Sequence, residues 1–138
     1  METEGLLDPE TETDARAQFE MLAPAAETVV KEAARQMGFD KAEFEERITD
    51  DVIRAAQESL FASLLVVSVG TREEYEQWCA DHSCEAIEVG HKRVDHAVWH
   101  PAPFAERVVA ATFQDEREAA VGTLRRQAFG RIYREILG

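Results

Sequence analysis

The chain has 138 residues, a length typical of one domain, and 45% of them are hydrophobic, as in proteins that fold around a core. It carries 28 acidic and 15 basic side chains, a net charge of −13, and the basic set is 12 arginines and only three lysines. This balance argues against a basic nucleic-acid-binding protein. It indicates a surface adapted to molar salt, where charges are screened within about 3 Å.

The sequence shows no sign of membrane insertion or export. The longest apolar run, residues 60–69, is too short to cross a bilayer, and the acidic first residues lack an apolar leader. We therefore expect a cytoplasmic protein whose two cysteines are reduced.

The first half of the chain predicts a tail followed by helices. Residues 1–12 are acidic and contain glycine and proline, which predicts a flexible tail ahead of a single domain, residues 13–138. Helical spacing predicts helices over residues 13–22, 24–37 and 41–48. Asp40 and Glu43 form a predicted capping box for the third, and Thr49 is the predicted N-cap of a fourth helix that reaches Leu60.

The second half predicts strands over residues 64–70, 84–89, 94–100 and 107–113, with a hairpin turn at residues 90–93. A capping box of Thr71 and Glu74 predicts a helix between the first two strands. A second box, of Asp115 and Glu118, predicts a long final helix ending near Leu137. The predicted class is α+β, with N-terminal helices, a mostly antiparallel sheet of about four strands and a long C-terminal helix.

All histidines and cysteines fall within residues 79–100. Imidazole and thiolate are zinc ligands, so a metal site is one interpretation, with Cys79, His82, Cys84, His96 and His100 as its candidate ligands. The spacing lacks a C-x-x-C pair, and His96 and His100 would lie about 13 Å apart on a regular strand. We prefer core cysteines, surface histidines and no cofactor. A cysteine nucleophile with a histidine base stays open.

The final helix holds the one basic stretch of the chain. Arg126, Arg131 and Arg134 are candidate interaction residues, because arginine beside aromatic residues can contact bases or phosphates. On a regular helix these residues and Arg125 do not share a face, which favours pairing with carboxylates over nucleic-acid binding. Gly122 and Gly130 suggest close helix packing, and we expect it at a dimer interface.

Three segments carry a family resemblance: TVVKEAAR at 28–35, FASLLVVSVGTREEY at 61–75 and AATFQDEREAAVGTLRRQAFGR at 110–131. Together they resemble a family of small, acidic haloarchaeal proteins that form a domain of unknown function. The resemblance covers nearly the whole chain beyond the tail and implies a salt-rich cytosol. It implies no activity, cofactor or catalytic residue.

These observations predict a non-catalytic interaction domain that acts as a homo-oligomer or with an unidentified protein partner, and away from membranes. Two alternatives remain: a metal-binding protein or metal-dependent enzyme that uses the cluster at 79–100, and a nucleic-acid-binding protein that uses the arginines of the last helix.

Overall fold

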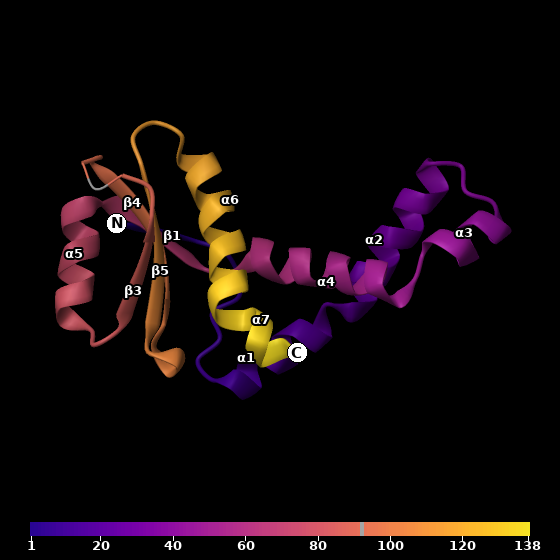
Figure 1. Ribbon diagram of the computed structural model, residues 1–138, viewed down its shortest axis with the longest axis horizontal. Coiled ribbons are helices and arrows are strands. Elements are labelled where there is room, and N and C mark those ends of the chain that lie inside the picture. The colour runs from indigo at the N-terminus through magenta and orange to yellow at the C-terminus, as the bar shows by residue number, and fades with distance from the viewer. Residues whose placement is uncertain (92) are drawn as a thin grey trace.

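The computed structural model describes residues 1–91 and 93–138 and confirms the α+β class (Figure 1). Its sheet has five strands in the order β1–β2–β4–β5–β3, in which β3 runs parallel to β5 and all other pairs are antiparallel. The strands are β1 (Glu2–Glu4), β2 (Val67–Thr71), β3 (Glu85–Val89), β4 (His96–Ala102) and β5 (Arg107–Phe113).

Helices occupy most of the remaining chain: α1 (Glu12–Met21), α2 (Ala23–Gln36), α3 (Lys41–Arg47), α4 (Asp50–Leu64), α5 (Arg72–Asp81) and a short 3₁₀ turn η1 (Pro103–Ala105). The predicted long C-terminal helix consists of α6 (Arg117–Ala128), the π-helical turn η2 (Phe129–Tyr133) and α7 (Arg134–Leu137). No helix in the described part of the chain is both long and apolar enough to pass through a bilayer.

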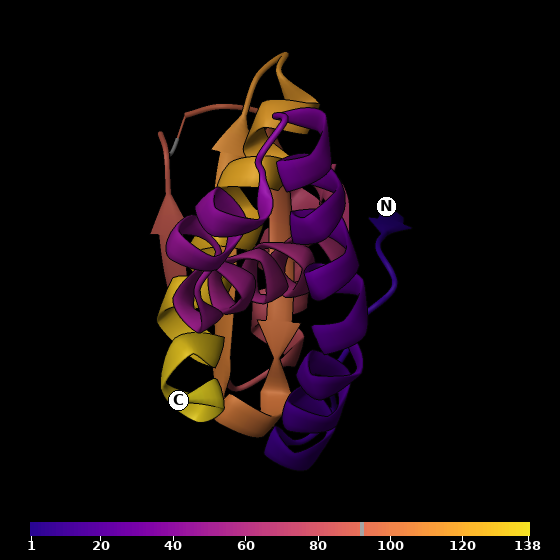
Figure 2. The same cartoon turned by 90° about the vertical axis from the view of Figure 1, so that its right-hand side faces the viewer.

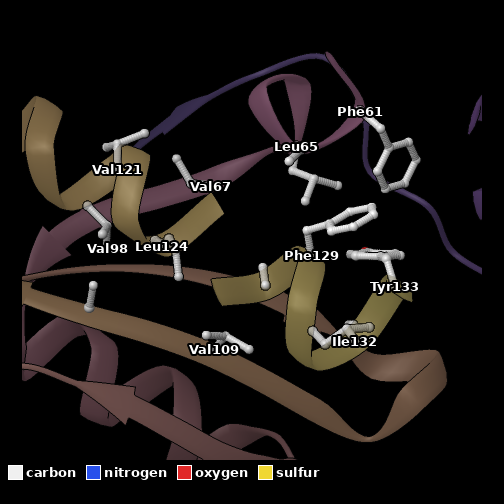
Figure 3. Packing of buried hydrophobic residues seen from close by; sticks show 14 of the residues in the cluster. Phe61, Leu65, Val67, Val98, Val109, Val121, Leu124, Phe129, Ile132 and Tyr133 are labelled. Atoms are coloured by element: carbon white, nitrogen blue, oxygen red, sulfur yellow. The ribbon is translucent and has the colours of Figure 1, made fainter. Parts of the chain in front are cut away.

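The sheet separates two hydrophobic clusters. The C-terminal helix covers one face of the sheet and α5 covers the other (Figure 1). Phe61 from α4 lies at the centre of the larger cluster, with its ring edge-on to Phe129 at 6.1 Å and to Tyr133 at 5.2 Å (Figure 3). Tyr75 and Trp99 pack at 5.4 Å in the smaller cluster beneath α5. Edge-on aromatic contacts add stabilisation beyond their buried area.

Helices α2, α3 and α4 form an arm that extends away from the sheet, and we call it the helical arm (Figures 1 and 2). Helix α2 packs along α4 and buries small or medium side chains: Ala26, Val30 and Ala34. Val29 and Met37 are more than half exposed. Only the inner side of the helical arm is therefore covered within one chain.

The predicted hairpin between residues 84–89 and 94–100 is wrong, because β3 pairs with β5 instead of β4. Lys92, within the predicted turn, lies outside the described residues. Strand β5 has four consecutive buried residues, Val108 to Ala111, and needs a partner strand on each side. Strand β3 is mostly exposed, which suits the edge of the sheet.

Two segments differ from their sequence-based descriptions. Within the predicted tail, Glu2–Glu4 form β1, which pairs with β2 at an edge of the sheet. Gly5 follows with a φ of 114°, and a Cβ there would lie 2.5 Å from the carbonyl oxygen of Leu65, so only glycine fits this approach. Helix α4 continues through Leu64, and β2 begins three residues later than predicted, because an apolar run has no periodicity that marks a helix end.

Candidate functional site: an arginine groove

The cysteine and histidine residues of the predicted metal site do not converge. Among residues 1–91 and 93–138, no three His, Cys, Asp or Glu side chains are placed to hold one ion. The ring of His82 stacks on Trp78 at 4.1 Å, and its Nδ1 lies 2.8 Å from the Trp78 carbonyl oxygen. His96 stacks on Phe113 at 5.2 Å. Each ring is thus held by an aromatic neighbour.

The two cysteines are free and half-buried, Cys79 in the last turn of α5 and Cys84 just before β3. Partial burial, with smaller effects of Cys79 and Glu106, raises the pKa of the Cys84 thiol. A raised pKa favours the thiol, which is a weaker nucleophile than the thiolate.

His100 is fully buried in the core between β4 and the C-terminal helix. Its Nδ1 lies 2.6 Å from the carbonyl oxygen of Val66, which can only accept, so Nδ1 carries the proton. Its Nε2 then accepts from the Tyr133 hydroxyl at 2.7 Å. Burial lowers the pKa of His100 and raises that of Tyr133, so both groups are held neutral. The two hydrogen bonds of His100 thus provide partners for its own ring nitrogens, the Tyr133 hydroxyl and the Val66 carbonyl oxygen inside the core.

A groove of about 610 Å³ lies where α4 meets the C-terminal helix, at the base of the helical arm. Helix α4 contributes mostly small side chains, and the C-terminal helix contributes Gly122, Phe129 and three arginines. We call it the arginine groove, and its walls are Ala55, Glu58, Ser59, Ala62, Ser63, Gly122, Arg125, Arg126, Phe129 and Arg134.

The three arginines of the groove make only partial contacts within the chain. Arg125 is half-buried, and its Nε donates to the Leu65 carbonyl oxygen at 3.0 Å. Arg126 makes a long contact of 3.4 Å with the Thr123 hydroxyl. In the part of the chain that the structure describes, no carboxylate lies within 4.0 Å of any of these guanidinium groups. The predicted ion pairs of these residues therefore do not form within one chain.

The π-helical turn η2 explains why arginines from opposite sides of a regular helix meet here. With about 100° per residue, Arg125 and Arg134 would lie about 180° apart on a regular α-helix. The backbone N–H of Arg134 instead donates to Phe129, five residues earlier. This wide turn takes up one extra residue and reduces the angle to roughly 80°. It also places the Arg134 guanidinium over the Phe129 ring, at 5.5 Å.

The structure brings two of the three predicted interaction residues together, Arg126 and Arg134, and adds Arg125. Arg131 is not part of the groove walls. Its Nε lies 3.4 Å from Oε1 of Gln127, and its carbonyl oxygen accepts from Arg107 at 2.8 Å. A helical wheel drawn for an unbroken α-helix has no signal for the π-turn, so the sequence could not show this grouping.

Guanidinium groups bind carboxylates and phosphates through paired, parallel N–H donors. Three such groups around one groove supply the donors that an anionic group would need.

No curated protein and no solved structure matches the chain. A family model matches residues 6–134, nearly the whole chain, and its description assigns no activity. The chain belongs to this family of unknown function, DUF5809.

Proposed function

We propose that this protein is a non-catalytic interaction module that binds a carboxylate-bearing segment of a protein partner in the arginine groove. One observation supports the proposal most directly. Arg125, Arg126 and Arg134 surround a single groove in a chain of 28 acidic residues, yet each is beyond ion-pair distance of every described carboxylate.

The shape of the groove favours a short segment of polypeptide. Its volume of about 610 Å³ falls in the range of sites that hold small ligands or a few side chains. Ala55, Ala62 and Phe129 supply apolar surface beside the cationic groups. A short acidic peptide would contact both surfaces, with its carboxylates on the arginines and its aliphatic carbons on the apolar wall.

The surroundings of the groove disfavour a long polyanion. The molecule carries a net charge of −13, and all its carboxylates are at least partly exposed. A nucleic acid that extended beyond the groove would approach this negative surface. The proposal takes the protein to work in a salt-rich cytoplasm, as its composition predicts. There, only contacts as close as those of paired guanidinium and carboxylate groups escape screening.

Fluorescence anisotropy with a dye-labelled, end-capped hexaglutamate tests the proposal. The assay uses the lowest KCl concentration at which the circular dichroism spectrum still matches that in molar KCl. We expect saturable binding that weakens as KCl rises. The double variant Arg126→Ala, Arg134→Ala should bind about tenfold more weakly, since each exposed pair contributes up to about 1 kcal/mol. The control Arg131→Ala, outside the groove, should bind like the parent.

Two results would contradict the proposal. One is equal hexaglutamate binding by the parent and the double variant. The other is tighter, groove-dependent binding of a single-stranded oligonucleotide, which would assign the site to nucleic acid.

A further inference from the structure

The occupant of the arginine groove can be inferred from the other end of α4. This helix has 15 residues and a length of about 22 Å, and the groove lies along its residues 55–63. Its first turn, which follows α3 in the helical arm, carries Asp50 and Asp51 (Figure 1). Both are exposed, and neither forms an ion pair with any described residue. Two carboxylates without an ion-pair partner thus lie in the first turn of α4, and three arginines of the C-terminal helix without one lie beside its later turns.

Asp51 and the groove share one face of α4, whereas Asp50 lies on the other side, seven residues before Gln57. Asp51 and Val52 precede Ala55 by four and three residues, and Ala55 precedes Ser59 by four, so all lie along one side of the helix. The opposite side is occupied within the chain: the Gln57 amide donates to the Phe19 carbonyl oxygen at 2.9 Å, and Phe61 is in the core. Val52 is 39% exposed on the open side. The groove wall thus continues outward as an uncovered helix face.

We propose that a second copy of this chain fills the groove, with the two helical arms side by side and antiparallel. This inference rests on the proposed function and names the partner. In this arrangement Asp51 of the partner subunit reaches the arginine groove, and the reverse contact forms at the other end. A two-fold axis makes the two contacts identical and closes the assembly as a dimer.

The charges and the dimensions fit this pairing. Three guanidinium groups and Glu58 give each groove a net charge of +2, which attracts the carboxylate of Asp51 of the partner subunit. Asp51 does not pair with the arginines of its own groove, since no described carboxylate lies within 4.0 Å of their guanidinium groups. The side chains near the axis, Ala55 and Ser59, are small and allow two helices to approach closely. Val52 would lose its exposure in the same contact.

Sedimentation velocity with charge-reversed variants tests the pairing, at the KCl concentration chosen for the peptide assay. The groove variant is Arg126→Glu, Arg134→Glu, and the tip variant is Asp50→Lys, Asp51→Lys. Each variant alone brings like charges together at both contacts, so we expect at least a tenfold weaker dimer than for the parent. A 1:1 mixture restores opposite charges at both contacts and should form heterodimers. The control Glu45→Lys, Glu46→Lys makes the same charge change on α3 and should dimerise like the parent.

The outcomes separate this inference from the proposed function. A monomeric parent, variants that dimerise like the parent, or a mixture that stays monomeric would each overturn the antiparallel dimer. Hexaglutamate binding to the monomeric tip variant, whose groove no second copy fills, would still support the proposed function. Failure of the peptide to bind that variant would overturn the proposed function and the inference resting on it. Circular dichroism of each variant verifies that it is folded.

Discussion

At the scale of single residues, His100 shows how the core accommodates a polar ring. The imidazole is bonded on both sides, by a backbone carbonyl 34 residues away and by a tyrosine hydroxyl 33 residues away. Leaving a buried polar atom without a partner costs about 1–3 kcal/mol. No local sequence pattern predicts these two hydrogen-bond partners, because both come from distant parts of the chain. The sequence therefore placed His100 among candidate metal ligands.

Because burial lowers the pKa of His100, the protein should lose stability in mild acid. Above the ordinary pKa of 6.5, the imidazole is neutral in both the folded and the unfolded chain. As the pH falls below that value, the unfolded chain binds a proton that the folded chain does not. The unfolding free energy then falls by up to about 1.4 kcal/mol per pH unit until the folded pKa is reached.

Urea unfolding between pH 7 and pH 5 measures this loss. In His100→Gln the amide can keep both hydrogen bonds without titrating, and the slope of stability against pH should become shallower. His91→Gln, at an exposed position, should keep the parent slope. Equal slopes for all three proteins would show that His100 does not control the acid response.

At the scale of secondary structure, helix caps show which local patterns specify a boundary. The predicted box at Thr71 and Glu74 is confirmed: Glu74 N–H donates to the threonine hydroxyl at 3.1 Å, and Thr71 N–H donates to the carboxylate at 3.0 Å. The Thr71 N–H also lowers the pKa of Glu74. The similar box predicted at Asp115 and Glu118 is wrong. Helix α6 begins at Arg117, without a side-chain cap.

The two sites form a matched pair for mutagenesis. Thr71→Ala removes a hydroxyl that accepts from the helix backbone and should lower the unfolding free energy by about 1 kcal/mol. Asp115→Ala removes a side chain that caps nothing, so its urea midpoint should stay close to that of the parent. Loss of stability in Asp115→Ala equal to that in Thr71→Ala would mean that α6 begins earlier than described.

The sequence predicted the bounds of helices and strands better than it predicted which of them lie side by side. Strand β5 has the predicted bounds, and Thr49 caps α4 as expected. The pairing of β3 with β5 depends on which strand needs a partner strand on each side. That requirement follows from the order of the strands in the whole sheet, which no local pattern gives. The arginine groove was missed for a related reason. Its geometry depends on one π-turn, and no residue type in η2 marks such a turn.

At the scale of the whole molecule, the acidic residues are distributed over the outside. Gln57 and His100 are the buried polar residues of the described chain, and no carboxylate is buried with them. Most ion pairs of the described residues join exposed side chains, which contribute little individually. The net charge of −13 thus acts mainly as repulsion between exposed groups, and this repulsion opposes compaction in dilute buffer.

Salt should therefore stabilise the fold. Raising KCl from about 0.1 M to about 1 M shortens the screening length from about 10 Å to about 3 Å, and the urea midpoint should rise. Sorbitol at matched osmolality does not screen charge and should give a smaller rise. Equal stability in dilute buffer and in molar KCl would contradict salt adaptation of this surface.

Strand β1 has a consequence for how the chain behaves at high concentration. It is only three residues long, and two of them are glutamates that meet Arg117 at 2.7 and 3.5 Å, while the Met1 amino group meets Glu74 at 3.0 Å. A short, charged outer strand is a poor template for another sheet. Cleavage of the first five residues would expose the backbone N–H and C=O groups of β2 beside Val67 and Val69. Strand β2 would then be an unprotected edge strand, from which cross-β aggregation can start.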